Sequence, residues 1–175
     1  MSSCAFEVRP ITEKDLEEVL EVYRQCEDFL ALGPQPRASK AMVLKDIETS
    51  RSERGLFYGI FASDGRMVGV VDFIPGSFNG EAHLAFISLL MIVAPLRNRG
   101  IGTRALELIE NKIRATGQVS EIRTAVQLNN PAALLFWQRN NYRVFGNPEL
   151  RPDQTVVSYL RKELFDYQRC DTGRA

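Results

Sequence analysis

Hydrophobic and polar positions alternate along the chain with two periods, which predict helices in some segments and strands in others. After Thr12, which forms with Asp15 the polar start of a capping box, apolar residues recur at helical spacing. Residues 56–62 and 67–74 are instead rich in β-forming residues, and an Asp-Gly pair between them is typical of a hairpin turn. Both kinds of element therefore lie close together in the sequence.

Over the whole chain, the same two periods predict a mixed α/β (α+β) domain. Strands are expected at 6–10, 56–62, 67–74, 82–93, 121–128, 143–145 and 155–160, and helices at 12–23, 27–32, 39–50, 100–116 and 131–140. Several strands precede the first strand–helix–strand crossover, so the sheet should be antiparallel at first and parallel in its middle. One domain is expected over residues 1–165, followed by a flexible tail over 166–175.

Composition narrows the function classes. The 175 residues suit one domain, and 22 basic against 22 acidic residues give no excess that favours nucleic acid. Cys4, Cys26 and Cys170 are far apart and His83 is the single histidine, so neither a metal site nor a disulfide framework is expected. The N-terminus lacks a signal-peptide pattern, and the longest apolar run is too short to cross a bilayer. We therefore expect a cytoplasmic protein with no membrane partner.

Segment 93–103 joins a buried strand to a helix through a glycine-rich turn. The first turn of a helix has free backbone N–H groups and the positive end of the helix dipole. Gly100 and Gly102 would let a phosphate approach that backbone closely, and Arg97 and Arg99 add positive charge. A pyrophosphate is the natural ligand of such a corner. The plainer interpretation is a turn with exposed arginines and no ligand.

A second interpretation of these glycines is the dinucleotide fingerprint G-x-G-x-x-A, which residues 100–105 match. Glu121 lies near the distance expected for its ribose-binding acid. However, Glu121 begins the next strand where the fingerprint needs the acid at the strand's end. Pro95 and the arginines also separate the strand from the glycines, and too little chain follows for a doubly wound sheet. These features disfavour the fingerprint.

Two motifs in this order resemble the GNAT superfamily of acetyltransferases. The first is the acetyl-CoA motif (R/Q)-x-x-G-x-(G/A), matched by Arg97-x-x-Gly100-x-Gly102. The second is N-x-x-A-x-x-L-Y-x-K, matched by Asn130-x-x-Ala133-x-x-Phe136-Trp137-x-Arg139. The resemblance covers roughly residues 82–145. It implies a mostly antiparallel central sheet of about six to seven strands flanked by helices, with a parallel pair splayed at the CoA site.

Carried over residue by residue, the resemblance implies a cosubstrate site for acetyl-CoA. The pantetheine arm would pair with backbone groups of Met91, Ile92 and Val93, and the Ile92 amide would act as an oxyanion donor. The pyrophosphate would contact Arg97, Asn98, Arg99, Gly100, Ile101, Gly102 and Thr103. Asn130 would touch the pantetheine or hold the strand end. The CoA channel would be lined by Ala133, Phe136 and Trp137, and Arg139 could reach a CoA phosphate. No metal is implied.

The sequence departs from the family pattern at both proton-transfer positions. Trp137 stands where a tyrosine often serves as general acid, and an indole has no usable acid proton. Ser88 and Phe86 stand where some members carry a strand base. Asp72 and Glu81 are therefore candidate bases, and Ser88 could hold a water. A solvated strand end explains Asp72 equally well, and His83 is expected to be structural.

The resemblance implies transfer of an acetyl group from acetyl-CoA to a primary amine of an acceptor, either a small molecule or a peptide. Asp28, Tyr58 and Asp72 are weak candidates for holding the ammonium group. The two departures keep an alternative from another class open, a non-catalytic acyl-CoA-binding sensor or regulatory module. A homodimer is one assembly that the sequence allows.

Overall fold

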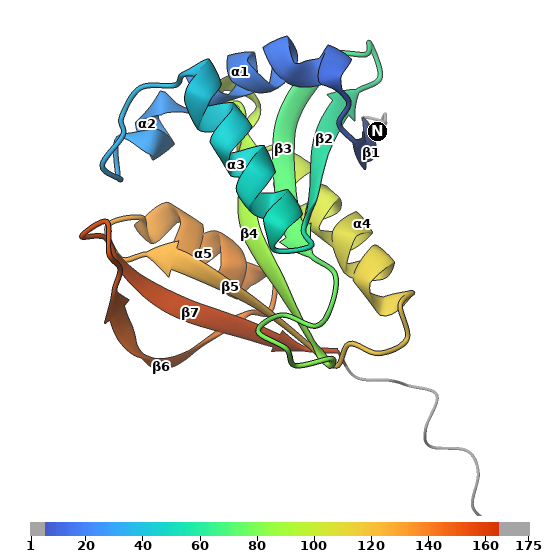
Figure 1. Cartoon of the computed structure of the whole chain (residues 1–175), viewed down its shortest axis with the longest axis vertical. Helices are drawn as coiled ribbons and strands as arrows, with labels where there is room; N and C mark the ends of the chain where they lie inside the picture. Colours follow the sequence, from blue (N-terminus) through green and yellow to red (C-terminus); the bar gives the residue numbers. More distant parts are fainter. Residues whose placement is uncertain (1–5, 165–175) are drawn as a thin grey trace, which may run out of the picture.

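A seven-stranded mixed sheet forms the centre of the molecule, with strand order β1-β2-β3-β4-β5-β7-β6 (Figure 1). The computed structural model describes residues 6–164, so the expected tail, Cys4 and Cys170 lie outside it. The strands are β1 (Phe6–Pro10), β2 (Leu56–Ala62), β3 (Met67–Ile74), β4 (Leu84–Ile92), β5 (Glu121–Gln127), β6 (Arg143–Leu150) and β7 (Val156–Glu163). The helices are η1 (Glu13–Asp15), α1 (Leu16–Arg24), α2 (Glu27–Leu30), α3 (Lys40–Ser52), η2 (Ala94–Leu96), α4 (Ile101–Arg114) and α5 (Pro131–Arg139).

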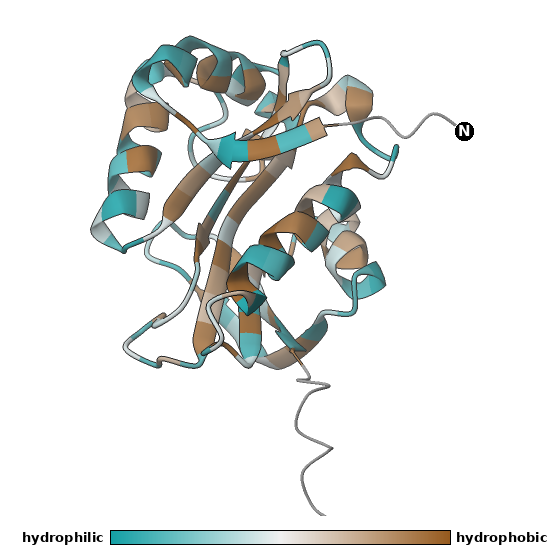
Figure 2. Cartoon of the chain, turned by 90° about the vertical axis from the view of Figure 1, so that its right-hand side faces the viewer, coloured by the Kyte–Doolittle hydropathy of each residue, from teal (hydrophilic) through white to brown (hydrophobic). Residues whose placement is uncertain are grey.

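Helices cover both faces of the sheet, α1 and α3 on one face and α4 on the other (Figures 1 and 2). The apolar sides of α1 and α4 supply Val19, Tyr23, Ile109 and Ile113, all buried. Strand β3 is buried along its whole length because helices lie on both of its sides. No helix among residues 6–164 is long and apolar enough to span a membrane.

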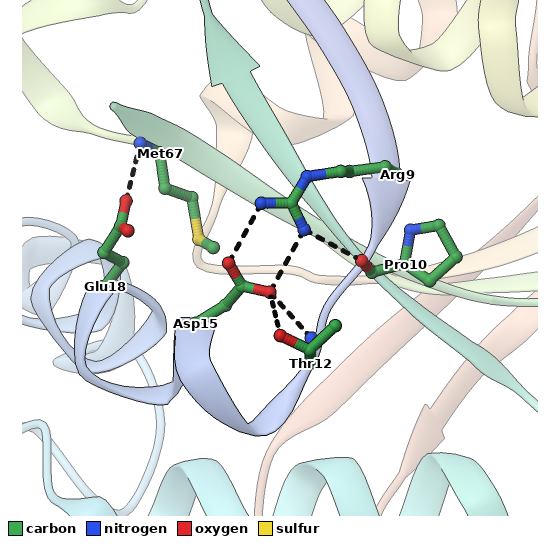
Figure 3. A network of polar contacts seen from close by, with 6 residues as sticks. All are labelled: Arg9, Pro10, Thr12, Asp15, Glu18 and Met67. Carbon is green, nitrogen blue, oxygen red and sulfur yellow. Dashed lines mark hydrogen bonds and ion pairs between the residues drawn. The ribbon is translucent and has the colours of Figure 1, made fainter. Parts of the chain in front are cut away.

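The chain enters α1 through a polar network that the capping pattern predicted (Figure 3). The carboxylate of Asp15 accepts from the N–H of Thr12 at 2.7 Å and from its hydroxyl at 2.8 Å. Arg9 of β1 adds two further bonds to the same carboxylate, at 3.0 and 3.1 Å. These bonds hold the pKa of Asp15 well below its usual range, with the Arg9 contact the largest cause. The network fixes the edge strand to the first helix.

Strands β4 and β5 run parallel and pair only over their first halves. Residues Leu84 to Ile87 pair with Glu121 to Thr124, after which the strands diverge (Figure 1). The divergence begins at a β-bulge, because Asp72 of β3 pairs with Leu89 and Phe73 pairs with Ile87, which leaves Ser88 as an extra residue in β4. A bulge bends its strand and increases the local twist. The result is a gap between the far halves of β4 and β5.

The expected fold class and order of elements are confirmed, with differences at the ends. The first helix opens with the 3-10 turn η1, and the second ends at Leu30. The expected strand 143–145 extends to Leu150, with an irregularity between Phe145 and Glu149. Most of β6 is exposed at the sheet edge, so it has no hydrophobic alternation by which its length could be predicted.

Candidate active site

The gap between β4 and β5 receives backbone groups of Leu90 and Ile92. Val93 donates its N–H to Val68 O at 3.0 Å. The backbone N–H and C=O groups of Val93 and of Met91, two residues earlier, therefore point toward β3. Strand alternation turns the N–H and C=O groups of Leu90 and Ile92 toward the gap. Of the three residues expected to pair with pantetheine, only Ile92 offers a backbone group to the gap, and that group is its N–H, because its carbonyl accepts from Arg97 Nε. Leu90 joins it, and sequence analysis missed that residue.

Arg97 fixes the end of β4 instead of pointing freely at solvent. Its Nε donates to Ile92 O at 2.8 Å, and the same carbonyl lies 3.5 Å from Cys26 Sγ. The terminal nitrogens of Arg97 bind the carboxylate of Asp28 on α2, one of them at 3.0 Å. Asp28 is therefore engaged with Arg97 and is not free to hold an ammonium group. This contact ties α2 to the start of the glycine-rich turn.

The turn before α4 presents a continuous row of backbone amides. Gly100 has φ of +80° and caps the helix, and Asn98 has φ of +59°. No acceptor within residues 6–164 bonds the amides of residues 98–103; the first helical bond is from Arg104 N to Gly100 O at 3.0 Å. Successive free N–H groups at a helix N-terminus form a concave site for anions. Arg99 is exposed beside this row and its guanidinium has no partner among the described residues.

Helix α5 lies beside this turn. Asn130 caps the helix, its side chain accepting from Ala133 N at 3.0 Å. Phe136 approaches the turn so closely that a Cβ added to Gly102 would lie 3.2 Å from its ring. Trp137 is buried, edge-on to Phe136 with ring centroids 5.3 Å apart. Arg139 is exposed at the end of α5.

A cavity of about 740 Å³ continues from the gap onto the sheet face that α3 partly covers. Its lining contains Asn130, Ala133 and Trp137 of the α5 region, so the expected channel residues reach it, except Phe136. The remaining lining comes from α2, the end of α3, the β3–β4 loop and strands β4 to β7. Space of this size suits a small-molecule site.

Asp72 lies buried beside the cavity, which contradicts the solvated strand end considered from sequence. Its carboxylate accepts from Ser50 Oγ of α3 at 2.5 Å, and its exposed fraction is 8%. Burial raises the pKa of Asp72 to about 6, even though hydrogen bonds from Ser50 and Ser88 lower it. Gly55 leaves room for this arrangement, since a Cβ there would lie 2.6 Å from Ser50 Oγ. A carboxyl group with this pKa can exchange protons near neutral pH.

The other sequence-predicted proton carriers differ in position. Ser88 is exposed and lines the cavity next to Asp72. Glu81 is exposed in the β3–β4 loop, 3.7 Å from His83, and does not line the cavity. Tyr58 lies on the opposite face, under Lys112 of α4. Asp72 and Ser88 are thus brought together, whereas Glu81 and Tyr58 are not.

Sequence analysis also missed the polar side chains that β5 contributes to the cavity. Arg123 and Gln127 of β5 alternate with the buried residues of that strand and so face the cavity. The side-chain oxygen of Gln127 is buried without a partner in the described part of the chain. Alternation along β5 could have identified the exposed face, but only the fold reveals that a cavity covers it. No three His, Cys, Asp or Glu residues within 6–164 are grouped to hold a metal ion.

Comparisons with known proteins identify the architecture. The fold resembles an acetyltransferase from Thermus thermophilus, with a TM-score of 0.78 and 24% identity over 94% of this chain and 100% of that one. It also resembles a ribosomal-protein-alanine N-acetyltransferase from Brucella melitensis (TM-score 0.70, 16% identity, 90% and 99% covered). A third similar structure is a ribosomal-protein α-N-acetyltransferase in complex with coenzyme A (TM-score 0.72, 16% identity, with 93% of this chain and 96% of that one covered). No curated protein sequence matches significantly. A sequence model of the acetyltransferase (GNAT) family matches residues 16–142, and the chain is therefore a member of that family and an acetyltransferase.

Proposed function

We propose that this acetyltransferase moves an acetyl group from acetyl-CoA to a primary amine by direct transfer. One observation carries the proposal: amides of residues 98–103 that no acceptor among residues 6–164 bonds follow closely in the chain after the gap-facing backbone of Ile92 and Leu90. A pyrophosphate and an amide-bearing arm fit these two features in that order. The family and the coenzyme A complex of one structural neighbour support this choice of donor.

The chain would hold the donor mainly through backbone groups that face the turn and the gap. The amides of residues 98–103, with Arg99 beside them, would bind the pyrophosphate. Leu90 and Ile92 would pair with the pantetheine amides as an added strand does, while Asn130 and Trp137 border the arm from α5. Acetyl-CoA supplies the thioester, and the N–H of Leu90, at the end of the arm far from the pyrophosphate, would polarise its carbonyl oxygen. Leu90 would take this role in place of Ile92, whose N–H pairs with the arm and whose carbonyl accepts from Arg97 Nε.

Asp72 is the proposed proton acceptor. An alkylamine has a pKa of about 10, so it must lose a proton before or as its nitrogen bonds to the carbonyl carbon. Asp72 is largely ionised at pH 7 because its pKa is about 6. It can take that proton directly or through a water held by the Ser88 hydroxyl. The C–S bond then breaks, and the electron pair leaves on sulfur.

No general acid is needed for the leaving group in this scheme. Thiols have a pKa of about 8.5, so the thiolate departs unprotonated and takes a proton from water. Trp137 would pack beside the sulfur without donating to it as an acid. Trp137→Phe should therefore lower kcat/KM only modestly, and Trp137→Tyr should not raise it greatly. A profile that falls at high pH in the wild type, but not in Trp137→Phe, would contradict this role.

The test is release of free thiol from acetyl-CoA across a panel of primary amines, with mass spectrometry of the product. Amine-dependent release together with a mass gain of one acetyl group is the expected result. Thiol release without an acetylated amine would indicate thioester hydrolysis. CoA binding without release from any amine would favour the alternative function, an acyl-CoA sensor.

A further inference from the structure

Arg123 lines the cavity, and the terminal nitrogens of its guanidinium make no hydrogen bond within residues 6–164. The Nε of Arg123 bonds Glu121 Oε1 at 2.5 Å, and the guanidinium lies 5.1 Å from the centroid of the Phe145 ring. Its terminal nitrogens have no partner within residues 6–164, and the side chain is 25% exposed. The guanidinium is therefore fixed from one side, with its other donors facing the cavity. A donor group fixed in advance binds a ligand with little ordering cost.

The charge around Arg123 favours a singly charged anion. Glu121 is shared by two guanidiniums, since Arg161 lies 3.5 Å from its other oxygen. These three side chains together carry a net charge of about +1. A carboxylate matches that excess and accepts two parallel bonds from a guanidinium edge. A dianion would be less well balanced beside Glu121.

The space between Arg123 and the proposed amine position has an apolar wall. Phe86 of β4 is the register partner of Arg123, and its ring stacks on Phe78 with centroids 4.3 Å apart. Asp72 lies two strands away from Arg123 and two residues along β3 from Ile74, the residue of β3 that pairs with Phe86. Standard strand spacings then place the two Cα atoms about 12 Å apart. The Arg123 guanidinium is held toward Glu121, on the side away from Asp72, so its side chain does not shorten this separation. An α-amino acid, with one carbon between amine and carboxylate, is therefore too short to reach both.

We propose that the acceptor is an amine joined by an apolar spacer to a carboxylate, with the carboxylate bound by Arg123 and the spacer lying on Phe78 and Phe86. This inference rests on the proposed amine acetylation, because it uses the Asp72 end as the amine position. It names a class of acceptor, the ω-amino carboxylates. The Gln127 side-chain oxygen, buried and unpartnered among the described residues, offers a further acceptor for the N–H groups of the amine.

Binding calorimetry tests the carboxylate site apart from catalysis. The probes are 6-aminohexanoate and 6-amino-1-hexanol, measured with the full chain in the presence of saturating CoA. The two probes share an amine and spacer length and differ at the charged end. Loss of a charge-assisted pair typically costs about tenfold or more in affinity. The wild type should therefore bind 6-aminohexanoate about tenfold or more tighter than the alcohol.

Arg123→Met should abolish this preference, while Arg123→Lys should keep part of it. Arg66→Met, at the β2–β3 turn remote from the cavity, is the matched control and should keep the full preference. Equal binding of both probes by the wild type, or a preference that survives in Arg123→Met, would overturn the proposal. Thiol release with simple alkylamines is unaffected by that outcome, so failure of the carboxylate site is distinguishable from failure of amine acetylation.

Discussion

Single buried residues set how the stability of this molecule depends on pH, and Asp72 is the clearest case. Its carboxyl group is buried, and burial raises its pKa to about 6, above the value of about 3.9 expected in the unfolded chain. The folded state therefore holds the proton more tightly. Stability is greatest below the unfolded pKa and falls as the pH rises from about 4 to about 6. Above this range the fold holds a buried carboxylate at Asp72, at a cost in stability.

Asp72→Asn should remove the loss of folding stability that accompanies ionisation of Asp72. The variant should be more stable than the wild type at pH 8 by up to about 3 kcal/mol, with a much smaller difference at pH 4. Urea denaturation at several pH values measures this. If Asp72 is the base, kcat/KM should fall about 10²–10⁴-fold. A stability difference that does not vary with pH would show that the buried group is not ionised.

Gly102 supplies a second test at this scale. A side chain there meets the Phe136 ring and places any carboxylate against the free amides of the turn. Gly102→Asp should abolish CoA binding measured by calorimetry. Asn111→Asp adds the same charge near the other end of α4 and should leave CoA affinity nearly unchanged. Equal affinity in both variants would remove the assignment of the pyrophosphate site.

Between elements, the buried carboxylate of Glu110 joins α4 to the C-terminal part of the sheet. It accepts from Lys162 Nζ of β7 at 2.7 and 2.9 Å and from Tyr142 OH at 3.0 Å. Glu110 is 3% exposed, so these partners replace its water. The same contacts keep the Tyr142 ring against Trp137, with centroids 4.8 Å apart. A polar cluster therefore supports one wall of the cavity from behind.

Glu110→Ala should destabilise the fold by about 3 kcal/mol, because it leaves Lys162 and the Tyr142 hydroxyl without their partner. Chemical denaturation measures the loss. The double variant Glu110→Met, Lys162→Met should recover much of it, since no buried charge is then left unpaired. A double variant as unstable as Glu110→Ala would indicate that packing, not charge, sets the cost.

Elements could be predicted from sequence where a pattern repeats within one segment. The capping pair Thr12 and Asp15 marked the first helix, and the glycines at 100 and 102 marked the turn before α4. The contacts that shape the site join segments far apart in sequence: Ser50 with Asp72, and Arg97 with Asp28. No local periodicity encodes such pairs. The bulge at Ser88 was missed for the same reason, because it exists only relative to β3.

As a whole, the molecule consists of two groups of strands that are joined over a short parallel ladder. Beyond Ile87 and Thr124 nothing in the described backbone connects β4 to β5. If the pantetheine arm pairs with Leu90 and Ile92, the ligand supplies the missing connection. Binding then stabilises the fold by mass action, by about 2.7 kcal/mol at a hundredfold excess over Kd.

CoA should accordingly raise Tm and slow amide hydrogen exchange at Ile92 and Leu90. The amide of Val93 already donates within the sheet and serves as the internal comparison, with a smaller change expected. The Gly102→Asp variant should show neither effect. Uniform protection across the sheet, without extra slowing at these two amides, would mean that the arm does not pair with β4.

The extra residue Ser88 lies where β4 diverges from β5, at the start of the gap that leads into the cavity. Asp72 and Phe73 are consecutive in β3, whereas their partners Leu89 and Ile87 are separated by Ser88 alone. Deleting Ser88 would leave the later residues of β4 in register with β3 and restore a regular ladder. The straightened strand could then continue its pairing with β5 and close the gap. A single residue would thus separate a sheet that is split between β4 and β5 from one that is continuous.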